Sequence, residues 1–278
     1  MATLELRPRS ATEIVDASFQ LLRANFMPLV TLSVAVQLPM LVVRIWAVRN
    51  ALNFTTASAQ VMSSLVGSVL IFGVLLFLLA LVAQCALTVA TSQVYLGMVV
   101  DNGAALQRGL QRALWVVLTY IVVAVGLGIA FGVGIPLATA LPSVARIPLM
   151  LVLVAVAIWL GLRLIPLLSV LVLEDGGPID AIKRALYLGS GLVGHMFVSM
   201  LLGGLIYVGI AIVAAVAVAA LGAVIPALKD PSVTQVFEAA AGALVYPLLI
   251  AVAVVLYYDL RIRREGFDVE MMSRAVPR

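Results

Sequence analysis

Charged side chains are scarce in this sequence: Asp, Glu, Lys and Arg make up 11% of its 278 residues, against 64% hydrophobic residues. An ordinary globular chain is about 25% charged and about 45–50% apolar. With a mean hydropathy of +1.20, this chain has too few charges to give even one domain a wettable surface. The composition therefore predicts an integral membrane protein.

Histidine and cysteine occur once each, as His195 and Cys85. A lone cysteine forms no internal disulfide, and a lone histidine cannot build a two-histidine metal site. We expect Cys85 to be a small apolar residue in a packed helix. We expect His195 to form hydrogen bonds at the membrane interface, with proton relay as the alternative. Because the sequence also lacks P-loop, H-E-x-x-H and G-x-S-x-G motifs, we expect neither a cofactor nor enzyme activity.

Six long hydrophobic runs occupy most of the chain. A helix needs about 20 apolar residues to cross about 30 Å of hydrocarbon. The second and fifth runs exceed that length as straight helices, so each must tilt, bend or continue past the membrane. The predicted spans are 26–48, 61–100, 113–141, 148–173, 191–228 and 236–260.

The segments between these spans are too short for a soluble domain. The longest, residues 1–25, falls below the roughly 40 residues that a small domain needs. The fold class that follows is an all-α integral membrane protein with a six-span helical bundle, in a single membrane domain covering residues 1–278.

Basic residues fall mainly on one side of the predicted spans. Of the 17 Lys and Arg residues, twelve lie on the side of the two termini, four lie on the other side, and Arg163 lies within a span. The positive-inside rule then predicts cytoplasmic N- and C-termini. The abundance of Arg, Ala, Val, Leu and Gly indicates a bacterial source, so we expect the bacterial cytoplasmic (inner) membrane.

The basic residues flank hydrophobic segments instead of gathering on a soluble surface, so we expect no nucleic-acid partner. The partners expected are membrane lipids, with anionic headgroups at the cytoplasmic face, and a protein partner or a second copy of the chain.

Three amphipathic segments each precede a pair of spans. The first begins with Ser10-Ala11-Thr12-Glu13, which is a capping box. The second and third, DNGAALQRGLQRAL and DGGPIDAIKRAL, match at both ends, and Pro178 suits a first helical position. Such helices lie at the membrane interface with their basic side chains near anionic headgroups.

The sequence thus predicts three copies of one unit, an interfacial helix followed by a transmembrane hairpin. The alternative is that basic amphipathic connectors are simply common in membrane proteins. The units would cover 10–100, 101–173 and 174–260, and a basic cytoplasmic tail would follow at 261–278.

Arg163 is the sharpest polar feature inside a predicted span. Its exposure to lipid would cost about 2.5–3.5 kcal/mol, so we expect it to meet an acid, a backbone carbonyl or water. A structural ion pair or a snorkelling arginine is one interpretation, and an ion or substrate site is the other. The candidate acids are Glu13, Asp16, Glu174 and Asp259.

Small residues recur at helical spacing in two spans, where they predict close helix packing. These are Gly128 and Gly132 in one span, and Ala211, Ala215, Ala219 and Ala223 in another.

Three stretches of the chain, RPRSATEIVDASFQLLRANF, GLRLIPLLSVLVLEDGGPIDAIKRAL and VLYYDLRIRREGFDVEMM, are similar to a known group of sequences. They resemble bacterial proteins of the glycerophosphoryl diester phosphodiesterase membrane-domain family and related multi-pass families. The resemblance implies a helical membrane module. The phosphodiesterase domain of the family's fused members has no counterpart here, so hydrolysis is not implied. Mapped onto this chain, the resemblance draws attention to Glu13, Arg163, Glu174, Asp259, Arg261 and Glu265.

These observations predict a non-enzymatic scaffold or partner-binding module, which would use its cytoplasmic helices and the RIRREGFD tail as contact surfaces. One alternative is a transporter or lipid-handling protein with Arg163 facing a polar cavity. Another is an enzyme acting on lipid headgroups, which would need convergent carboxylates or a metal at the cytoplasmic rim.

Overall fold

The computed structural model describes residues 7–56, 59–225 and 230–269, and within these ranges it contains helices and no strands. Six helices in the described part are long and apolar enough to cross a membrane. The predicted all-α, multi-pass architecture is therefore confirmed. The helices are α1 (Ala11–Ala24), α2 (Phe26–Thr56), α3 (Ala59–Tyr95), α4 (Asn102–Ala140), α5 (Ser143–Arg163), α6 (Leu167–Leu173), α7 (Pro178–Leu188), α8 (Val193–Val224) and α9 (Pro231–Glu265).

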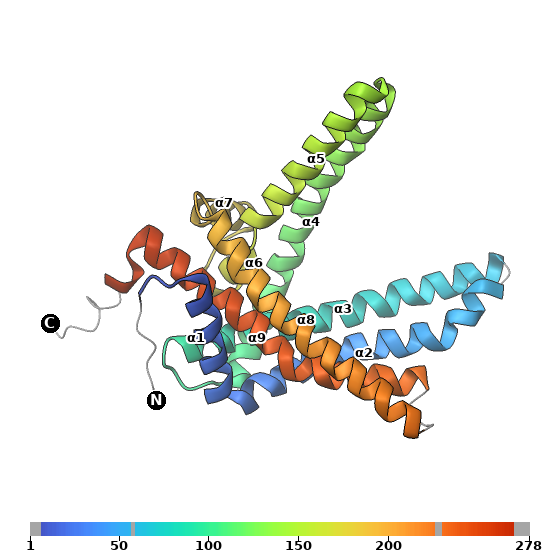
Figure 1. The fold of residues 1–278 in the computed structure, drawn as a ribbon, viewed down its shortest axis with the longest axis horizontal. Coiled ribbons are helices and arrows are strands. Elements are labelled where there is room, and N and C mark those ends of the chain that lie inside the picture. The colour runs from blue at the N-terminus through green and yellow to red at the C-terminus, as the bar shows by residue number, and fades with distance from the viewer. Residues whose placement is uncertain (1–6, 57–58, 226–229, 270–278) are drawn as a thin grey trace.

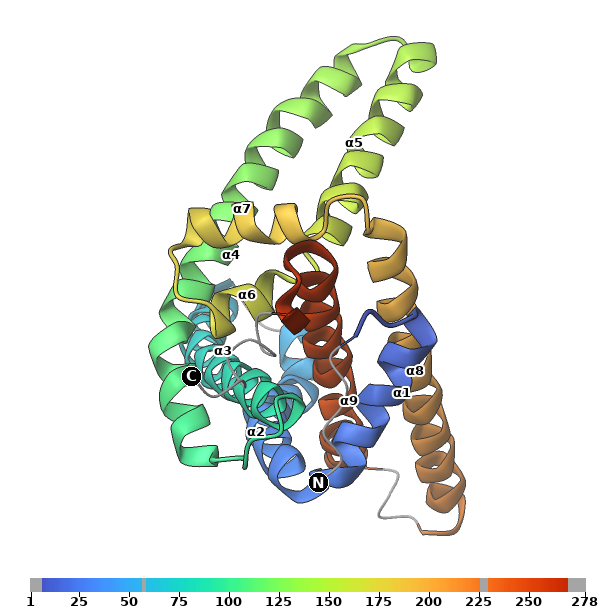
Figure 2. The same cartoon turned by 90° about the vertical axis from the view of Figure 1, so that its left-hand side faces the viewer.

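The long helices form three hairpins, α2 with α3, α4 with α5, and α8 with α9 (Figure 1). The hairpins meet at one end, which we call the base: α1, α6, α7, the first turns of α4 and α8, and the last turns of α9 (Figure 2). Helix α9 packs against α1, α2, α3 and α8. The α4–α5 hairpin starts at the base and points away from the other two hairpins, so its outer part projects by itself (Figure 1).

The core of the protein surrounds the second half of α9. Leu256, Tyr257 and Leu260 are buried there together with Ile14 of α1 and Leu171 of α6. The long helices expose many large apolar side chains towards their far ends, as lipid-facing helices do. The base is therefore the packed part of the molecule, and the hairpins project from it.

Two of the long hydrophobic runs are continuous helices, and one is interrupted. Helices α3 and α8 run without a break within the second and fifth predicted spans. In the fourth, α5 ends at Arg163 and α6 begins at Leu167, with Pro166, which has no backbone N–H to continue a helix, between them. Helix α3 ends at Tyr95, short of the predicted residue 100, where Gly97 adopts a φ of 74° that favours glycine.

The three amphipathic segments form helices in different ways. The capping box of α1 is present, with Ser10 and Glu13 bonding reciprocally. Helix α7 is likewise a short helix of its own, distinct from the long helix α8 that follows it, and Pro178 occupies its first turn. The second segment, in contrast, begins at an Asp101 cap and continues directly into α4. The three-unit repeat stays a prediction.

The close helix packing lies elsewhere than predicted. A Cβ added at Gly128 or Gly132 would meet nothing within 4 Å, and Ala211, Ala215, Ala219 and Ala223 are exposed. At Gly109 of α4, an added Cβ would lie 2.7 Å from the carbonyl oxygen of Val82 in α3. Backbone meets backbone at this point, so Gly109 lets α4 approach α3 at the base.

Replacing Gly109 with alanine should lower the free energy of unfolding by about 1–3 kcal/mol, because the backbone of α3 must move to admit the methyl group. The measurement is denaturant unfolding in detergent micelles. Gly128→Ala is the matched control and should be neutral or slightly stabilising. Equal stability of the two variants would contradict the close approach.

Candidate functional site

The carboxylate of Asp259 is the most buried charge of the base, with 1% of its side chain exposed. It lies in the last turns of α9, where Arg263 follows at i+4 and donates from Nε to Oδ2 at 2.7 Å. The Nε2 of His195, near the start of α8, lies 2.9 Å from the same oxygen. Since an ionised carboxylate only accepts hydrogen bonds, Nε2 carries the proton in this contact.

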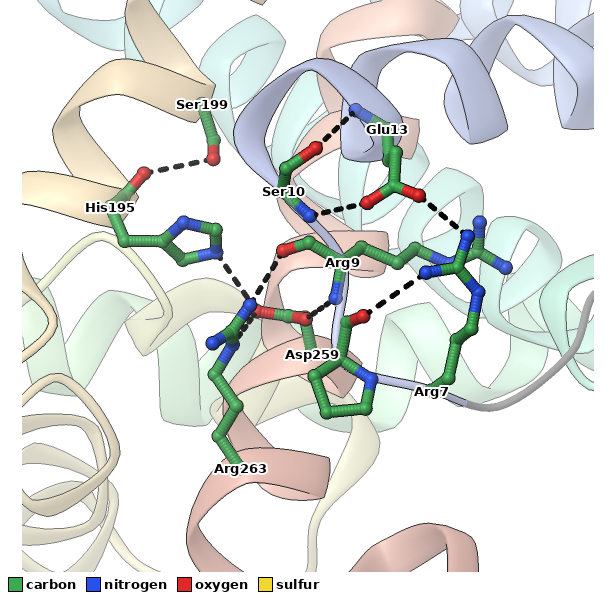
Figure 3. Close-up of polar contacts among 9 residues, drawn as sticks. Arg7, Arg9, Ser10, Glu13, His195, Ser199, Asp259 and Arg263 are labelled. Carbon is green, nitrogen blue, oxygen red and sulfur yellow. Dashed lines mark hydrogen bonds and ion pairs between the residues drawn. The ribbon is translucent and has the colours of Figure 1, made fainter.

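The segment before α1 completes the coordination of this carboxylate (Figure 3). The backbone N–H of Arg9 donates to Oδ1 of Asp259 at 2.7 Å. Arg263 in turn donates to the carbonyl oxygen of Arg9 at 2.6 Å. Both backbone groups of one residue are therefore bonded to α9, and the chain entering α1 is fixed beside the start of α8.

Glu13 stabilises the start of α1 from the adjoining turn. Its carboxylate accepts from the backbone N–H of Ser10 at 2.8 Å and from Arg7 at 2.5 Å. The Ser10 backbone hydrogen bond and the Arg7 side chain lower the pKa of Glu13 from 4.5 to about 2. The carboxylate therefore stays ionised at any physiological pH and favours the positive end of the helix dipole.

A second cluster joins α7 to the C-terminal end of α9. Arg184 donates to Glu174 at 2.8 Å and contacts both oxygens of Glu265, one of them at 2.9 Å. Tyr257 donates to the other oxygen of Glu174 at 2.7 Å. Burial lowers the pKa of Arg184, but its hydrogen bonds to Glu174 and Glu265 outweigh that effect, so the pKa is raised overall.

Arg261 of α9 also belongs to this cluster. It donates to Glu265 at 3.2 Å, one turn further along the helix. Its guanidinium also lies 4.2 Å from the ring centroid of Phe267, a cation–π contact.

A third set of ion pairs attaches α4 to the α6–α7 connection. Arg108 donates to Asp175 at 2.9 Å, and Arg112 contacts the same carboxylate oxygen. The three sets of contacts connect α1, α4, α7, α8 and α9 to one another through charges at the base.

Arg163, expected to meet an acid, a carbonyl or water, donates to the backbone carbonyl of Leu186 in α7 at 2.7 Å. Its guanidinium also lies 4.8 Å from the ring centroid of Trp159. The candidate acids do not pair with it among the described residues: Asp259 binds Arg263, Glu13 binds Arg7, Glu174 binds Arg184, and Asp16 is exposed on α1. Of the three partners expected for Arg163, the structure shows a backbone carbonyl and not an acid.

The six residues indicated by sequence thus separate into three places. Glu174, Arg261 and Glu265 share the Arg184 cluster. Glu13 and Asp259 lie on either side of the segment that enters α1 (Figure 3). Arg163 stands apart beside Leu186.

Sequence reasoning missed the roles of Arg9, Arg184 and Arg263. The spacing of Asp259 and Arg263 at i,i+4 was a usable signal. For the pair of Arg184 and Glu265, 81 residues apart, the sequence offered none. The expected hydrogen bond of His195 is present, and its partner is Asp259; the interfacial location stays a prediction.

The polar clusters of the base offer few of the arrangements that catalysis or metal binding requires. Ser199 donates to the backbone carbonyl of His195 at 2.8 Å, and not to its ring, so these residues do not form a nucleophile and base pair. Among the described residues, no group of three or more His, Cys, Asp or Glu side chains could hold a metal ion. The contacts instead bond elements to one another.

Comparison with known proteins gives no match: no family model, no curated protein and no solved structure matches this chain.

Asp259→Asn should lower the free energy of unfolding by about 1.5–3 kcal/mol, because it removes charge-assisted hydrogen bonds from a buried position. Thermal and denaturant unfolding in detergent micelles measure the change. Asp16→Asn alters an exposed acid of α1 and should change stability little. A loss no larger than that of the control would contradict the role of Asp259.

Arg7→Gln should raise the pKa of Glu13 from about 2 towards its ordinary value without reaching it, because the Ser10 backbone hydrogen bond remains. A carboxyl ¹³C titration by NMR measures the midpoint. Since the folded-state pKa is lowered, ionised Glu13 stabilises α1 fully above pH 4.5 and loses this effect as the pH falls through about 2. A midpoint of about 2 in the variant would contradict the contribution of Arg7.

Proposed function

We propose that this multi-pass membrane protein is a non-enzymatic scaffold that holds a membrane-embedded partner through its α4–α5 hairpin. The observation that carries the proposal is the separation of this hairpin from the other two (Figure 1). Beyond the base, α5 has α4 as its main neighbour within the described chain. Its apolar side chains are therefore available to helices of another protein or of a second copy.

The base supplies the rigidity that a scaffold needs. Its carboxylates, Glu13, Glu174, Asp175, Asp259 and Glu265, each bind an arginine of the same chain. The carboxylate of Asp259 is buried, and those of Glu174 and Glu265 are partly buried. Ion pairs removed from water in this way cost desolvation energy, and they favour one arrangement of the elements that they join. This supports a structural role for the charges at the base.

We place the protein in the bacterial cytoplasmic membrane, with its base and both termini at the cytoplasmic side. The support is the bias of Lys and Arg towards the side on which the base lies. Anionic headgroups would then surround the base, whose exposed basic residues include Arg23 and Lys183.

A transporter with a polar site at Arg163 is the alternative, and the geometry favours it less. Arg163 bonds to a backbone carbonyl and packs against Trp159. It does not line the groove between α2, α8 and α9 or four other hollows among the described residues. Snorkelling of Arg163 towards the base accounts for its position without a transported ligand.

A photoreactive amino acid at Ile129 of α4, which is 63% exposed, should crosslink in native membranes to one protein species in stoichiometric amount. The same amino acid at Val252 of α9, which is 0% exposed, is the control and should crosslink only within the chain. The products are measured by gel electrophoresis and mass spectrometry. Adducts with lipid alone at Ile129 would contradict the scaffold.

A further inference from the structure

A groove lies on the far side of the molecule from the base, between α2, α8 and α9. It encloses about 340 Å³ and is lined mainly by apolar side chains. Ala211, Ala215 and Val218 of α8 form one wall, and Phe237 and Val245 of α9 form the other. The small alanine side chains that were predicted to pack against another helix leave this space open instead.

The groove contains two opposite charges, Arg44 of α2 and Glu238 of α9. Both side chains are exposed. Neither forms an ion pair or hydrogen bond with a described residue, in contrast to the paired charges of the base. An arginine and a carboxylate thus border one apolar space without neutralising each other.

The position of these charges along the membrane can be counted on α9. Glu238 precedes Asp259 of the base by 21 residues, which is about 30 Å along a helix. That length matches the hydrocarbon thickness of about 30 Å. With Asp259 at one membrane surface, Glu238 lies near the opposite headgroup region. Val245 lies one to two turns deeper, so the groove leads from the headgroup level into the hydrocarbon.

We propose that the groove binds a phospholipid with a primary ammonium headgroup, taken from the leaflet opposite the base. Its phosphate would pair with Arg44, whose guanidinium fits phosphate oxygens. Its ammonium would donate to Glu238, and one acyl chain would lie between α8 and α9. This site is independent of the proposed scaffold surface on the α4–α5 hairpin.

The headgroup follows from the hydrogen-bonding capacity of the two side chains. A carboxylate only accepts hydrogen bonds, and a primary ammonium has three donors. A quaternary ammonium has none, so a choline headgroup leaves Glu238 without a hydrogen bond. A headgroup with net negative charge places another anion beside Glu238. Only the primary-ammonium lipid satisfies Arg44 and Glu238 together.

A second hollow of about 420 Å³ adjoins the groove. It is lined by Ala219, Gly222 and Ala223 of α8 and by Thr234 of α9, and it shares Glu238 with the first. The carboxylate therefore lies between the two spaces, so the headgroup can turn outward while the acyl chain enters the groove.

The test uses the full chain in nanodiscs that contain equal amounts of phosphatidylethanolamine, phosphatidylcholine and phosphatidylglycerol. After mild detergent extraction, the retained lipid is quantified by native mass spectrometry. The wild type should retain phosphatidylethanolamine about tenfold over phosphatidylcholine, the ratio given by one charge-assisted hydrogen bond. Equal retention of the two lipids would overturn the proposal, and this measurement needs no variant.

Two substitutions distinguish the contribution of Glu238 to lipid retention from that of Arg44. Glu238→Gln should reduce the preference for phosphatidylethanolamine over phosphatidylcholine to about one. Arg44→Gln should reduce the retention of all three phospholipids. Arg146→Gln removes an arginine at the far end of the α4–α5 hairpin, away from the groove, and should match the wild type. A preference that persists in Glu238→Gln, or one that Arg146→Gln abolishes equally, would overturn the site.

A second copy of the chain is the competing occupant. Ala215→Cys places a thiol in the groove, while the natural Cys85 is buried. In oxidised membranes the variant should remain free of disulfide-linked dimers. A dimer formed through Cys at this position would show that another protomer fills the groove, and would overturn the lipid assignment.

Discussion

The arrangement of the base depends on one carboxylate that has been taken out of water. Removing the charge of Asp259 from solvent is costly unless hydrogen bonds replace the lost hydration. Its partners come from three separate parts of the chain: the backbone of Arg9, the ring of His195 and the guanidinium of Arg263. Satisfying Asp259 therefore brings the start of α1, the start of α8 and the end of α9 to one point. The other ion pairs attach α4 and α7 to this point.

The features that could be predicted from sequence depend on neighbours along the chain. Hydrophobic runs indicated six long apolar helices, Ser10 and Glu13 indicated a capped helix, and Pro178 indicated a helix start, and these features are present. The exact bounds differ: the second run stops being helical before Gly97, and the fourth is interrupted at Pro166. Long-range contacts were different. The acceptor for Arg163 is the carbonyl of Leu186, and every residue has such a group, so no residue type could identify it. Spacing can show that a charge needs a partner, but only the fold selects the partner.

The same limit explains the alanine stripe of α8. Its spacing is typical of a helix contact, but the outer halves of α8 and α9 leave the groove between them. Arg44 and Glu238 lie 194 residues apart, so no spacing along the chain indicates that they border one space. The two ends of the molecule therefore use charge differently. Near the base, five carboxylates pair with arginines and join elements of the fold, those of Glu13, Glu174, Asp175, Asp259 and Glu265. The charges in the groove, in contrast, remain available to a ligand.

The contact between Arg9 and Asp259 spans 250 residues of the chain, which sets an order of events during synthesis. At about 5–20 residues per second, roughly 12–50 s separate the appearance of these two residues at the ribosome. The first two hairpins are synthesised before Asp259 exists. They can already pack on each other where α4 approaches α3 at Gly109, but the segment before α1 and the start of α8 still lack the carboxylate that joins them to α9. A ribosome that stops before residue 259 thus leaves the entry of α1 and the start of α8 without their common contact.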